Sequence, residues 1–292
     1  MPLSLREHVA LARKDKTAIG HFNASTIDGI WAIADAAAKL SLPVIVGVSE
    51  GERDYIGVRQ AAALVQSIRE ERDAPIFLDA DHTYSFERVK EAVDAGFDAV
   101  IFDGAQLSLA ENIEATKKCV EYVRSVSQRT GLDVLVEGEL GFIGTSSKVL
   151  DAVPAGAAVT EAEMTKPADA LKFVRETGVD LLAPAVGNVH GVIRGGDPAL
   201  DVKRVKEIAE AVGLPLVLHG ASGNTAEDVR KTVANGVAIV HVNTELRIAY
   251  RAGLIKSLSE NQDEVAPYKY LKPAKLSMQK VVEEKLKTIG GL

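Results

Sequence analysis

Residues 75–85 read PIFLDADHTYS, and this stretch decides the fold. Its first part, Pro75–Leu78, is a short apolar run typical of a strand that is buried on both faces. Polar side chains follow at once, with Asp79, Asp81 and His82 at the expected end of the strand. A carboxylate beside an imidazole at such a position suits metal binding and proton transfer. The simpler alternative is that Asp81 caps the following helix and His82 is a solvated loop residue.

The same alternation of a short apolar run and a longer amphipathic segment repeats along the chain. Parallel strands need such crossovers, and eight units in about 250 residues are typical of a (β/α)8 barrel, the TIM barrel. The expected strands are Ala18–Phe22, Pro43–Val48, Pro75–Leu78, Ala99–Phe102, Val134–Val136, Leu181–Ala185, Leu216–Leu218 and Ala238–Val242. The expected helices are residues 26–40, 55–72, 85–96, 109–129, 167–178, 200–213, 225–235 and 245–259.

A doubly wound open sheet is the alternative fold. It would require a glycine-rich dinucleotide fingerprint after the first strand, and the sequence there is HFNAST. Two segments fall outside the repeat. Residues 141–166 form a long Gly/Ser/Ala-rich connection, which we expect to be a mobile active-site loop. Residues 261–292 form a C-terminal extension with an extra helix at about 275–288, which we expect to pack on the barrel or on a second subunit. No linker divides the chain, so we expect residues 1–292 to form a single domain.

Composition excludes several classes of protein. The chain has 292 residues, 47% apolar and 26% charged, which is ordinary for a globular protein with a sizeable core. Its net charge of −7, without a basic run, gives no indication of nucleic acid or anionic membrane as a partner. The single cysteine, Cys119, permits no disulfide within the chain and is expected to be a passive core residue. No apolar run reaches the ~18 residues that span a bilayer, and we predict a cytoplasmic protein.

Unusual polar residues follow the expected strands, at the end of a barrel where active sites lie. Four of the six histidines are among them. His82, His190 and His219 come directly off three strands, and three histidines with one open position are the arrangement of a catalytic zinc site. His241 lies deeper, inside an apolar run, and is interpreted as a substrate contact or a support for the ligands. A lone histidine at such a place is more often structural, but four at one barrel mouth favour a site.

A second pattern predicts anion binding at the same end of the barrel. The stretch LHGASGNTAEDV, residues 218–229, combines a Gly/Ser loop with a helix start, and backbone N–H groups in such a loop bind phosphate. Asn243 and Thr244 lead into the helix after the eighth strand. Barrels often bind phosphate with these two loops. The turn alone is weak evidence, but its position beside His219 strengthens it.

At this point the residues resemble a known family. The chain is similar to the class II, metal-dependent ketose-bisphosphate aldolases, of the fructose- and tagatose-bisphosphate aldolase kind. The resemblance covers residues from about 17 to 288, in the family's order. Its motifs are FNAST, PVIVGVSEG, LDADHT, IFDGAQLSLAENI, VEGELGFIG, APAVGNVHG, LVLHGASG and VNTELR.

The resemblance implies roles for individual residues. His82, His190 and His219 would hold one catalytic Zn²⁺, and Asp81 would move the proton of the C4 hydroxyl. Glu139 would be a carboxylate near the metal, able to bind it in an alternative position. Backbone carbonyls near the phosphate site could hold a monovalent cation. The resemblance further implies support for the metal site from Asp103, substrate contacts from Asn23 and Ser49, and phosphate binding by Gly191, Gly220, Ser222, Asn243 and Thr244.

The sequence departs from the family in two places. The family's loop after ELGxxG usually reads Gly-x-Glu-Asp and supplies an acidic group, whereas TSSKV here places Ser146, Ser147 and Lys148 in that loop. On the last strand the family usually reads Lys-x-Asn, and Ile239 and His241 replace those residues. That asparagine normally contacts the reacting substrate oxygens, so His241 is counted among the catalytic candidates. The departures indicate either drift within a working aldolase or a shifted specificity.

These observations predict a lyase that reversibly cleaves fructose 1,6-bisphosphate to glycerone phosphate and D-glyceraldehyde 3-phosphate. Alternatives are the same chemistry on tagatose 1,6-bisphosphate or another phosphorylated ketose, a non-catalytic metal-binding barrel, and a metal hydrolase on the same fold. Asp81 argues against a mere binder. No lysine ends an inner strand, which disfavours a Schiff-base mechanism. By analogy with the family we expect a homodimer or homotetramer.

Overall fold

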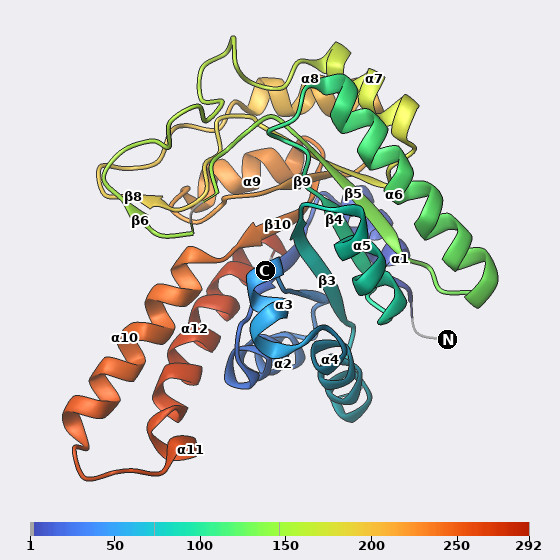
Figure 1. Ribbon diagram of the computed structural model, residues 1–292. Coiled ribbons are helices and arrows are strands. Elements are labelled where there is room, and N and C mark those ends of the chain that lie inside the picture. Colours follow the sequence, from blue (N-terminus) through green and yellow to red (C-terminus); the bar gives the residue numbers. More distant parts are fainter. Residues whose placement is uncertain (1–2, 73, 146, 292) are drawn as a thin grey trace.

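The computed structural model describes residues 3–72, 74–145 and 147–291, and eight parallel strands in it close into a barrel surrounded by helices (Figure 1). The order around the barrel is β1-β10-β9-β7-β5-β4-β3-β2, so the predicted TIM-barrel fold is confirmed. The barrel strands are β1 (Ile19–Asn23), β2 (Val44–Gly47), β3 (Ile76–Thr83), β4 (Ala99–Phe102), β5 (Leu135–Leu140), β7 (Leu181–Pro184), β9 (Leu216–Leu218) and β10 (Val237–Val242).

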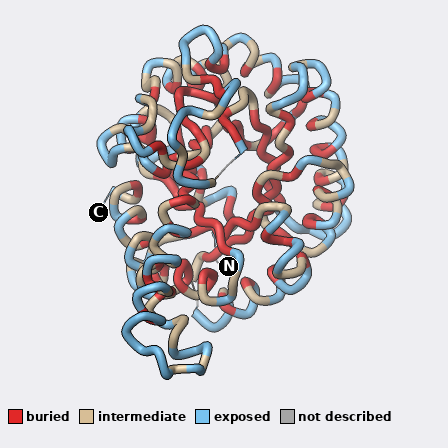
Figure 2. The backbone as a smooth tube through the Cα atoms, turned by 60° about the vertical axis from the view of Figure 1, so that its left-hand side comes forward, coloured by how far each residue is buried: buried red, intermediate tan, exposed pale blue. Residues whose placement is uncertain are grey.

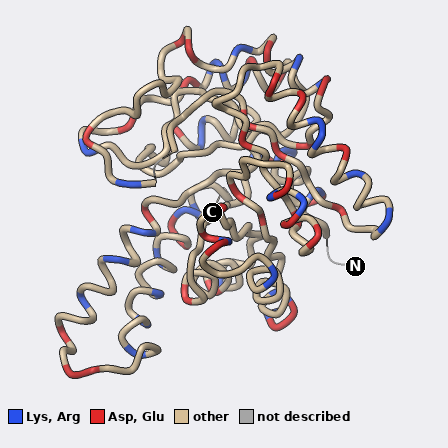
Figure 3. Tube along the Cα trace, in the orientation of Figure 1, with Lys and Arg blue, Asp and Glu red and all other residues tan. Residues whose placement is uncertain are grey.

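The helices follow the strands as crossovers, with additions at both ends of the chain. They are α1 (Leu5–Asp15), α2 (Ile27–Leu40), α3 (Glu50–Ile56), α4 (Val58–Arg72), α5 (Phe86–Asp94), α6 (Leu109–Thr130), α7 (Pro167–Thr177), α8 (Val202–Val212), α9 (Ala226–Ala234), α10 (Thr244–Glu260), α11 (Pro267–Tyr270) and α12 (Lys272–Ile289). Lys, Arg, Asp and Glu are interspersed along these outer helices (Figure 3). Among the described residues, no helix combines the length and apolar character that a membrane crossing requires.

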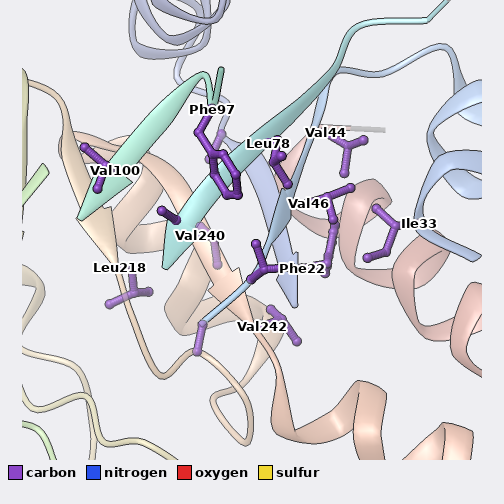
Figure 4. Close-up of a cluster of buried hydrophobic side chains, with 14 of the residues drawn as sticks. Phe22, Ile33, Val44, Val46, Leu78, Phe97, Val100, Leu218, Val240 and Val242 are labelled. Carbon is purple, nitrogen blue, oxygen red and sulfur yellow. The ribbon is translucent and has the colours of Figure 1, made fainter. Parts of the chain in front are cut away.

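Two layers of apolar side chains hold the barrel together. The larger layer lies between strands and helices, and Figure 4 shows part of it, with Val44 and Val46 of β2 beside Ile33 of α2. The smaller layer fills the inside of the barrel and is closed at one end by buried residues of α1. Figure 2 shows the same division, with buried strands inside an exposed outer surface. Because α1 closes the amino-terminal end, the open mouth lies at the carboxyl ends of the strands.

Several element boundaries differ from the sequence prediction, among them that of the fifth predicted strand, which extends to Leu140 in β5 instead of ending at Val136. The predicted helix 55–72 is two helices, because Gly57, with φ +93°, separates α3 from α4. The predicted strand ending at Leu78 continues to Thr83, with a register shift between Ala80 and Thr83 and with His82 at φ +33°. Such a bulge re-aims the side chains beside it. The polar residues placed after the strand therefore lie within it, at its irregular end.

The two segments outside the repeat take definite positions. The segment 141–166 carries β6 (Val149–Leu150), which pairs with β8 (Val192–Ile193) just after His190. Its mobility stays a prediction. The C-terminal extension forms α11 and α12, and α12 packs against α10 and α2. In Figure 1, α10, α11 and α12 form an arm that projects from one side of the barrel. Cys119 is fully buried in α6, as a passive core residue should be, and burial raises the pKa of its thiol to about 12.

Candidate active site

Three histidines converge at the barrel mouth. His82 lies on β3, His190 follows β7, and His219 follows β9. The Nε2 atom of His82 lies 3.2 Å from Nε2 of His190 and 3.3 Å from Nδ1 of His219. Ligand nitrogens around one tetrahedral zinc ion, each ~2.0–2.1 Å from it, lie about 3.3 Å apart. The three inner nitrogens are therefore spaced as ligands of a single ion.

The outer nitrogen of each ring has its own acceptor. The Nδ1–H of His82 donates to Asp103 (2.9 Å), the Nδ1–H of His190 donates to the Gly144 carbonyl (2.6 Å), and the Nε2–H of His219 donates to Glu137 (2.7 Å). Such partners fix the tautomer of a metal-binding histidine and orient its ring. In a neutral ring they leave the inner nitrogen without hydrogen, so three neutral rings would have three lone pairs facing one another. This arrangement is unfavourable by itself and fits a divalent cation.

The charge states of the three histidines also favour binding of a metal ion. Burial, together with the nearby His82, lowers the pKa of His190 to about 4. Burial and the charge of neighbouring histidines also hold the pKa of His219 well below its usual value. Burial alone would lower the pKa of His82, but the charges of Asp81, Asp103 and Glu139 outweigh it and raise that pKa well above its usual value. His190 and His219 are thus neutral, as metal ligands must be, and the carboxylates around His82 attract positive charge.

Asp81 presents one free oxygen to this cluster. It is 3% exposed, and its Oδ2 accepts a hydrogen bond from Nδ2 of Asn23 at 2.8 Å. Its Oδ1 has no hydrogen-bond partner and lies 3.8 Å from Nε2 of His82 and 3.6 Å from Nδ1 of His241. A second carboxyl, that of Glu139 on β5, lies 3.4 Å from Nδ1 of His82 and also has an unpartnered oxygen. Burial and the charge of Asp103 raise the pKa of Glu139 well above its usual value.

His241 is packed between two other imidazoles. The strand register places it opposite His21, and the two rings stack 3.5 Å apart at 4°. On the other side it stacks on His219 at 3.9 Å. Gly47 makes room for this stack, because a Cβ there would lie 2.0 Å from the His21 ring. Although these rings and Asp81 lie close together, parallel rings cannot direct their in-plane lone pairs at one ion, so this group is a packed support and not a second metal centre.

The residues expected to bind phosphate line the same cavity. Gly220 has φ +62°, and a Cβ there would lie 2.3 Å from the Val189 carbonyl, so only glycine fits. The backbone N–H of Asn243 donates to the Ser222 hydroxyl at 3.3 Å, and Thr244 begins α10. The cavity is lined by Asn23, Asp81, His82, Ser147, His190, Gly191, His219, Gly220, Ser222, His241, Asn243 and Thr244.

Not every predicted residue reaches the cavity surface. Glu139 lies behind His82, and Ser49 lies at the start of α3, where its hydroxyl donates to Glu52. In the loop that departs from the family pattern, Ser147 lies 3.4 Å from the Asn243 amide, Lys148 is exposed, and Ser146 lies outside the described residues. Ile239 is buried in the inner layer of the barrel. His8 is half-buried against Phe77 at the closed end, because the face of α1 next to it packs on the barrel.

Four supporting groups were not predicted from the sequence. The role of Glu137 as acceptor for His219 requires the closed barrel, and the Gly144 carbonyl is a backbone atom that no side-chain pattern reveals. Glu52 and Arg53 could have been found, because Ser49–Glu52 is a capping-box pattern that predicts a helix start at this point. Arg53 is 1% exposed and donates to the carbonyls of Val48 and Asp81 and to the Thr83 hydroxyl.

Replacing Arg53 with methionine is expected to lower the free energy of unfolding by about 2–3 kcal/mol, because buried carbonyls and a hydroxyl would lose their donors. Urea denaturation at fixed metal concentration would measure the change. Arg59→Met is the matched control, since Arg59 is exposed on the neighbouring helix α4. Equal stability of the Arg53 variant and the control would contradict the assigned role.

A barrel whose mouth gathers three histidines in this way is the architecture of a metal-dependent barrel enzyme. Comparison with known proteins makes the assignment specific. The family model for fructose-bisphosphate aldolase class-II matches residues 3–291. A fructose-bisphosphate aldolase of Staphylococcus epidermidis is 36% identical over 99% of this chain and 98% of its own, and a probable fructose-bisphosphate aldolase of Bacillus subtilis is 35% identical over 100% and 99%.

Solved structures agree with these relatives. The YdjI aldolase of Escherichia coli K12 superimposes with a TM-score of 0.82 at 28% identity, covering 99% of this chain and 98% of its own. A putative fructose-1,6-biphosphate aldolase of Coccidioides immitis superimposes with a TM-score of 0.81 at 30% identity, covering 98% of this chain and 96% of its own. The chain belongs to the class II fructose-bisphosphate aldolase family. Members of this family are lyases that act on phosphorylated ketoses and generally use a divalent metal ion.

Proposed function

We propose that the protein is a zinc-dependent aldolase that reversibly cleaves fructose 1,6-bisphosphate to glycerone phosphate and D-glyceraldehyde 3-phosphate. The observation that carries the proposal is the convergence of three imidazole nitrogens beside the unpartnered Oδ1 of Asp81. The names of the relatives favour fructose bisphosphate over tagatose bisphosphate as the substrate.

In this proposal His82, His190 and His219 hold the zinc ion. A zinc ion bound there would supply Lewis-acid stabilisation of the negative charge that cleavage of the C3–C4 bond leaves on the ketose fragment. Asp103, Glu137 and the Gly144 carbonyl keep the three rings oriented through their outer nitrogens. Glu139, with an unpartnered oxygen beside His82, offers the ion an alternative ligand.

Asp81 and His241 act on the substrate. The free Oδ1 of Asp81 takes the proton of the C4 hydroxyl as the bond breaks and returns it in the reverse reaction. Burial and the neighbouring His21 lower the pKa of His241 to about 3, so its ring is neutral near pH 7 and can donate one N–H to a substrate oxygen. Asn23, which lines the cavity, contacts the substrate from β1, whereas Ser49 lies outside the cavity lining and donates to Glu52 instead.

One of the two phosphate groups of the substrate binds in the same cavity as the three histidines. Gly191, Gly220 and Ser222 offer backbone N–H groups, and Asn243 and Thr244 place the amino terminus of α10 toward the cavity. A helix amino terminus next to a glycine loop is a favourable phosphate site. Backbone carbonyls in these loops could hold a monovalent cation that offsets the added charge.

The test is cleavage of fructose and tagatose 1,6-bisphosphates by the purified, zinc-loaded protein, each with and without EDTA. We expect chelator-sensitive cleavage of the fructose ester, restored by added zinc. Cleavage of the tagatose ester alone would overturn the substrate assignment. Cleavage of neither ester by zinc-loaded protein would overturn the proposed function and would favour a non-catalytic metal-binding barrel or a different substrate.

Another phosphorylated ketose is the second candidate substrate. The observation that favours it is the stacking of His241 between His21 and His219, where the family usually has asparagine. A ring fixed in this way can place its N–H differently from an asparagine amide. A panel of ketose 1-phosphates in the same assay would identify such a preference.

We further propose a cytoplasmic homodimer or homotetramer. Apolar side chains exposed on the projecting arm of α10, α11 and α12, among them Ile255, Leu258 and Tyr268, support association. Light scattering coupled to size-exclusion chromatography would measure the mass, and a monomer mass at micromolar concentration would contradict this proposal.

A further inference from the structure

A chain of hydrogen bonds runs from the rim of the barrel to the carboxylate of Asp81. Arg247, in the first turn of α10, donates to Oε1 of Glu52 at 2.7 Å. The other oxygen of Glu52, Oε2, accepts from Nδ2 of Asn23 at 2.9 Å. The same Nδ2 donates its second hydrogen to Oδ2 of Asp81 at 2.8 Å. Glu52, Asn23 and Asp81 are 6%, 4% and 3% exposed, so the inner part of the chain is shielded from water.

The position of Glu52 is held by several donors. Its Oε2 also accepts from the backbone N–H and the hydroxyl of Ser49, both at 2.9 Å. These bonds come from the helix cap, whereas the bond to Arg247 comes from a helix 195 positions further along the chain. Charge-assisted hydrogen bonds of this kind are stronger than neutral ones. The carboxylate of Glu52 is thus a fixed acceptor next to Asn23.

A fixed acceptor determines which way the Asn23 amide faces. A carboxylate can only accept, and an amide group carries two donors on its nitrogen and acceptors on its oxygen. With Glu52 on one side and Asp81 on the other, only the nitrogen satisfies both neighbours. Without Glu52 the Asn23 nitrogen would lose one of the two acceptors that hold it in place, and the amide could rotate away from Asp81.

We propose that Glu52 is a positioning residue that acts through Asn23 on Asp81. It keeps the Asn23 nitrogen bonded to Oδ2 of Asp81, and the other oxygen, Oδ1, therefore stays unpartnered and directed at the metal ligands. This inference rests on the proposed function, in which Oδ1 receives the proton of the C4 hydroxyl. Arg247 contributes by holding the outer oxygen of Glu52.

The chain contains a matched control for this role. Glu111 occupies the third position of α6 and makes the same capping-box bonds, to the backbone N–H and hydroxyl of Ser108. It is exposed and contacts neither Asn23 nor Asp81. Loss of a cap destabilises a helix to a similar degree in both places. A difference in kcat between Glu52→Ala and Glu111→Ala therefore reports on a role of Glu52 beyond helix capping.

The first experiment compares Glu52→Ala, Glu52→Gln and Glu111→Ala as zinc-loaded enzymes. For Glu52→Ala we expect kcat for ketose cleavage to fall about 10- to 100-fold, as is usual for groups that orient a functional residue, with little change in KM. The kcat of Glu52→Gln should fall less, because the side-chain carbonyl of glutamine still accepts a hydrogen bond from Asn23. Exchange of the C3 proton of glycerone phosphate with solvent should keep its rate in all three variants, since that step does not involve the C4 hydroxyl. Equal loss of cleavage and exchange would overturn the inference.

The second experiment does not depend on activity. Crystal structures of Glu52→Ala and Glu111→Ala with zinc bound would show the Asn23 and Asp81 side chains directly. We expect the 2.8 Å bond between them to be lost in the first variant and kept in the second. An unchanged bond in Glu52→Ala would overturn the proposal. If the wild-type protein cleaved neither bisphosphate, the proposed function would fail, while this structural comparison would still decide the role of Glu52.

Discussion

Replacing Asp81 with alanine is expected to reduce kcat for fructose 1,6-bisphosphate cleavage by about 10³-fold or more while zinc stays bound, because a general base contributes on this scale. The C4 hydroxyl must lose its proton as the C3–C4 bond breaks. In the described part of the chain, the unpartnered Oδ1 of Asp81 is the carboxylate oxygen that faces both the His82 inner nitrogen and His241. Alanine at this position leaves the proton without an acceptor.

Two measurements check this prediction together. Atomic absorption would give the zinc content of Asp81→Ala, and a coupled assay would give its kcat. Asp263→Ala is a suitable control, because Asp263 is exposed in the connection between α10 and α11. Cleavage at more than about a tenth of the wild-type rate would show that another group carries the proton.

Replacing His219 with alanine is expected to remove zinc binding and, with it, cleavage. In the proposed site three imidazoles hold the ion, and two ligands do not hold zinc tightly against competition from water and chelators. The change also leaves the buried Glu137 without its donor, since its Oε1 accepts from Nε2 of His219 at 2.7 Å. Loss of that partner adds a cost in stability of about 1–3 kcal/mol.

His8→Ala is the control for this variant. His8 lies at the closed end of the barrel, against Phe77, and is not part of the metal cluster. The His8→Ala variant should bind zinc with the stoichiometry of the wild-type protein in equilibrium dialysis. A His219 variant that kept full zinc content would refute the three-histidine assignment.

The sequence predicts the barrel and its mouth because both depend on local patterns. Apolar runs such as Val44–Gly47 are buried on both faces, and the polar residues after them gather wherever parallel strands end together. His82, His190 and His219 could be named for this reason before the closed barrel was known. The distances between their ring nitrogens could not be predicted, because these distances depend on the register of strands far apart in the chain and on the bulge in β3.

What the sequence does not predict comes from contacts between distant segments. The acceptor for His190 is a backbone carbonyl in another loop, and the stack of His21 on His241 forms only when β1 pairs with β10 to close the barrel. The bond from Arg247 to Glu52 joins two helix starts that no periodicity connects. Residue type indicates which groups are available, whereas long-range packing determines which of them act together.

The space that Gly47 leaves for the His21 ring has an evolutionary consequence. His21 fills it on one side and is covered by His241 on the other, so the three positions form one packed unit. Restoring the family's asparagine at 241 alone would uncover one face of the His21 ring, and a side chain at 47 would collide with it. These positions are therefore expected to be epistatic: replacements here should be tolerated only as a set, and His241→Asn alone would report on broken packing rather than on substrate preference.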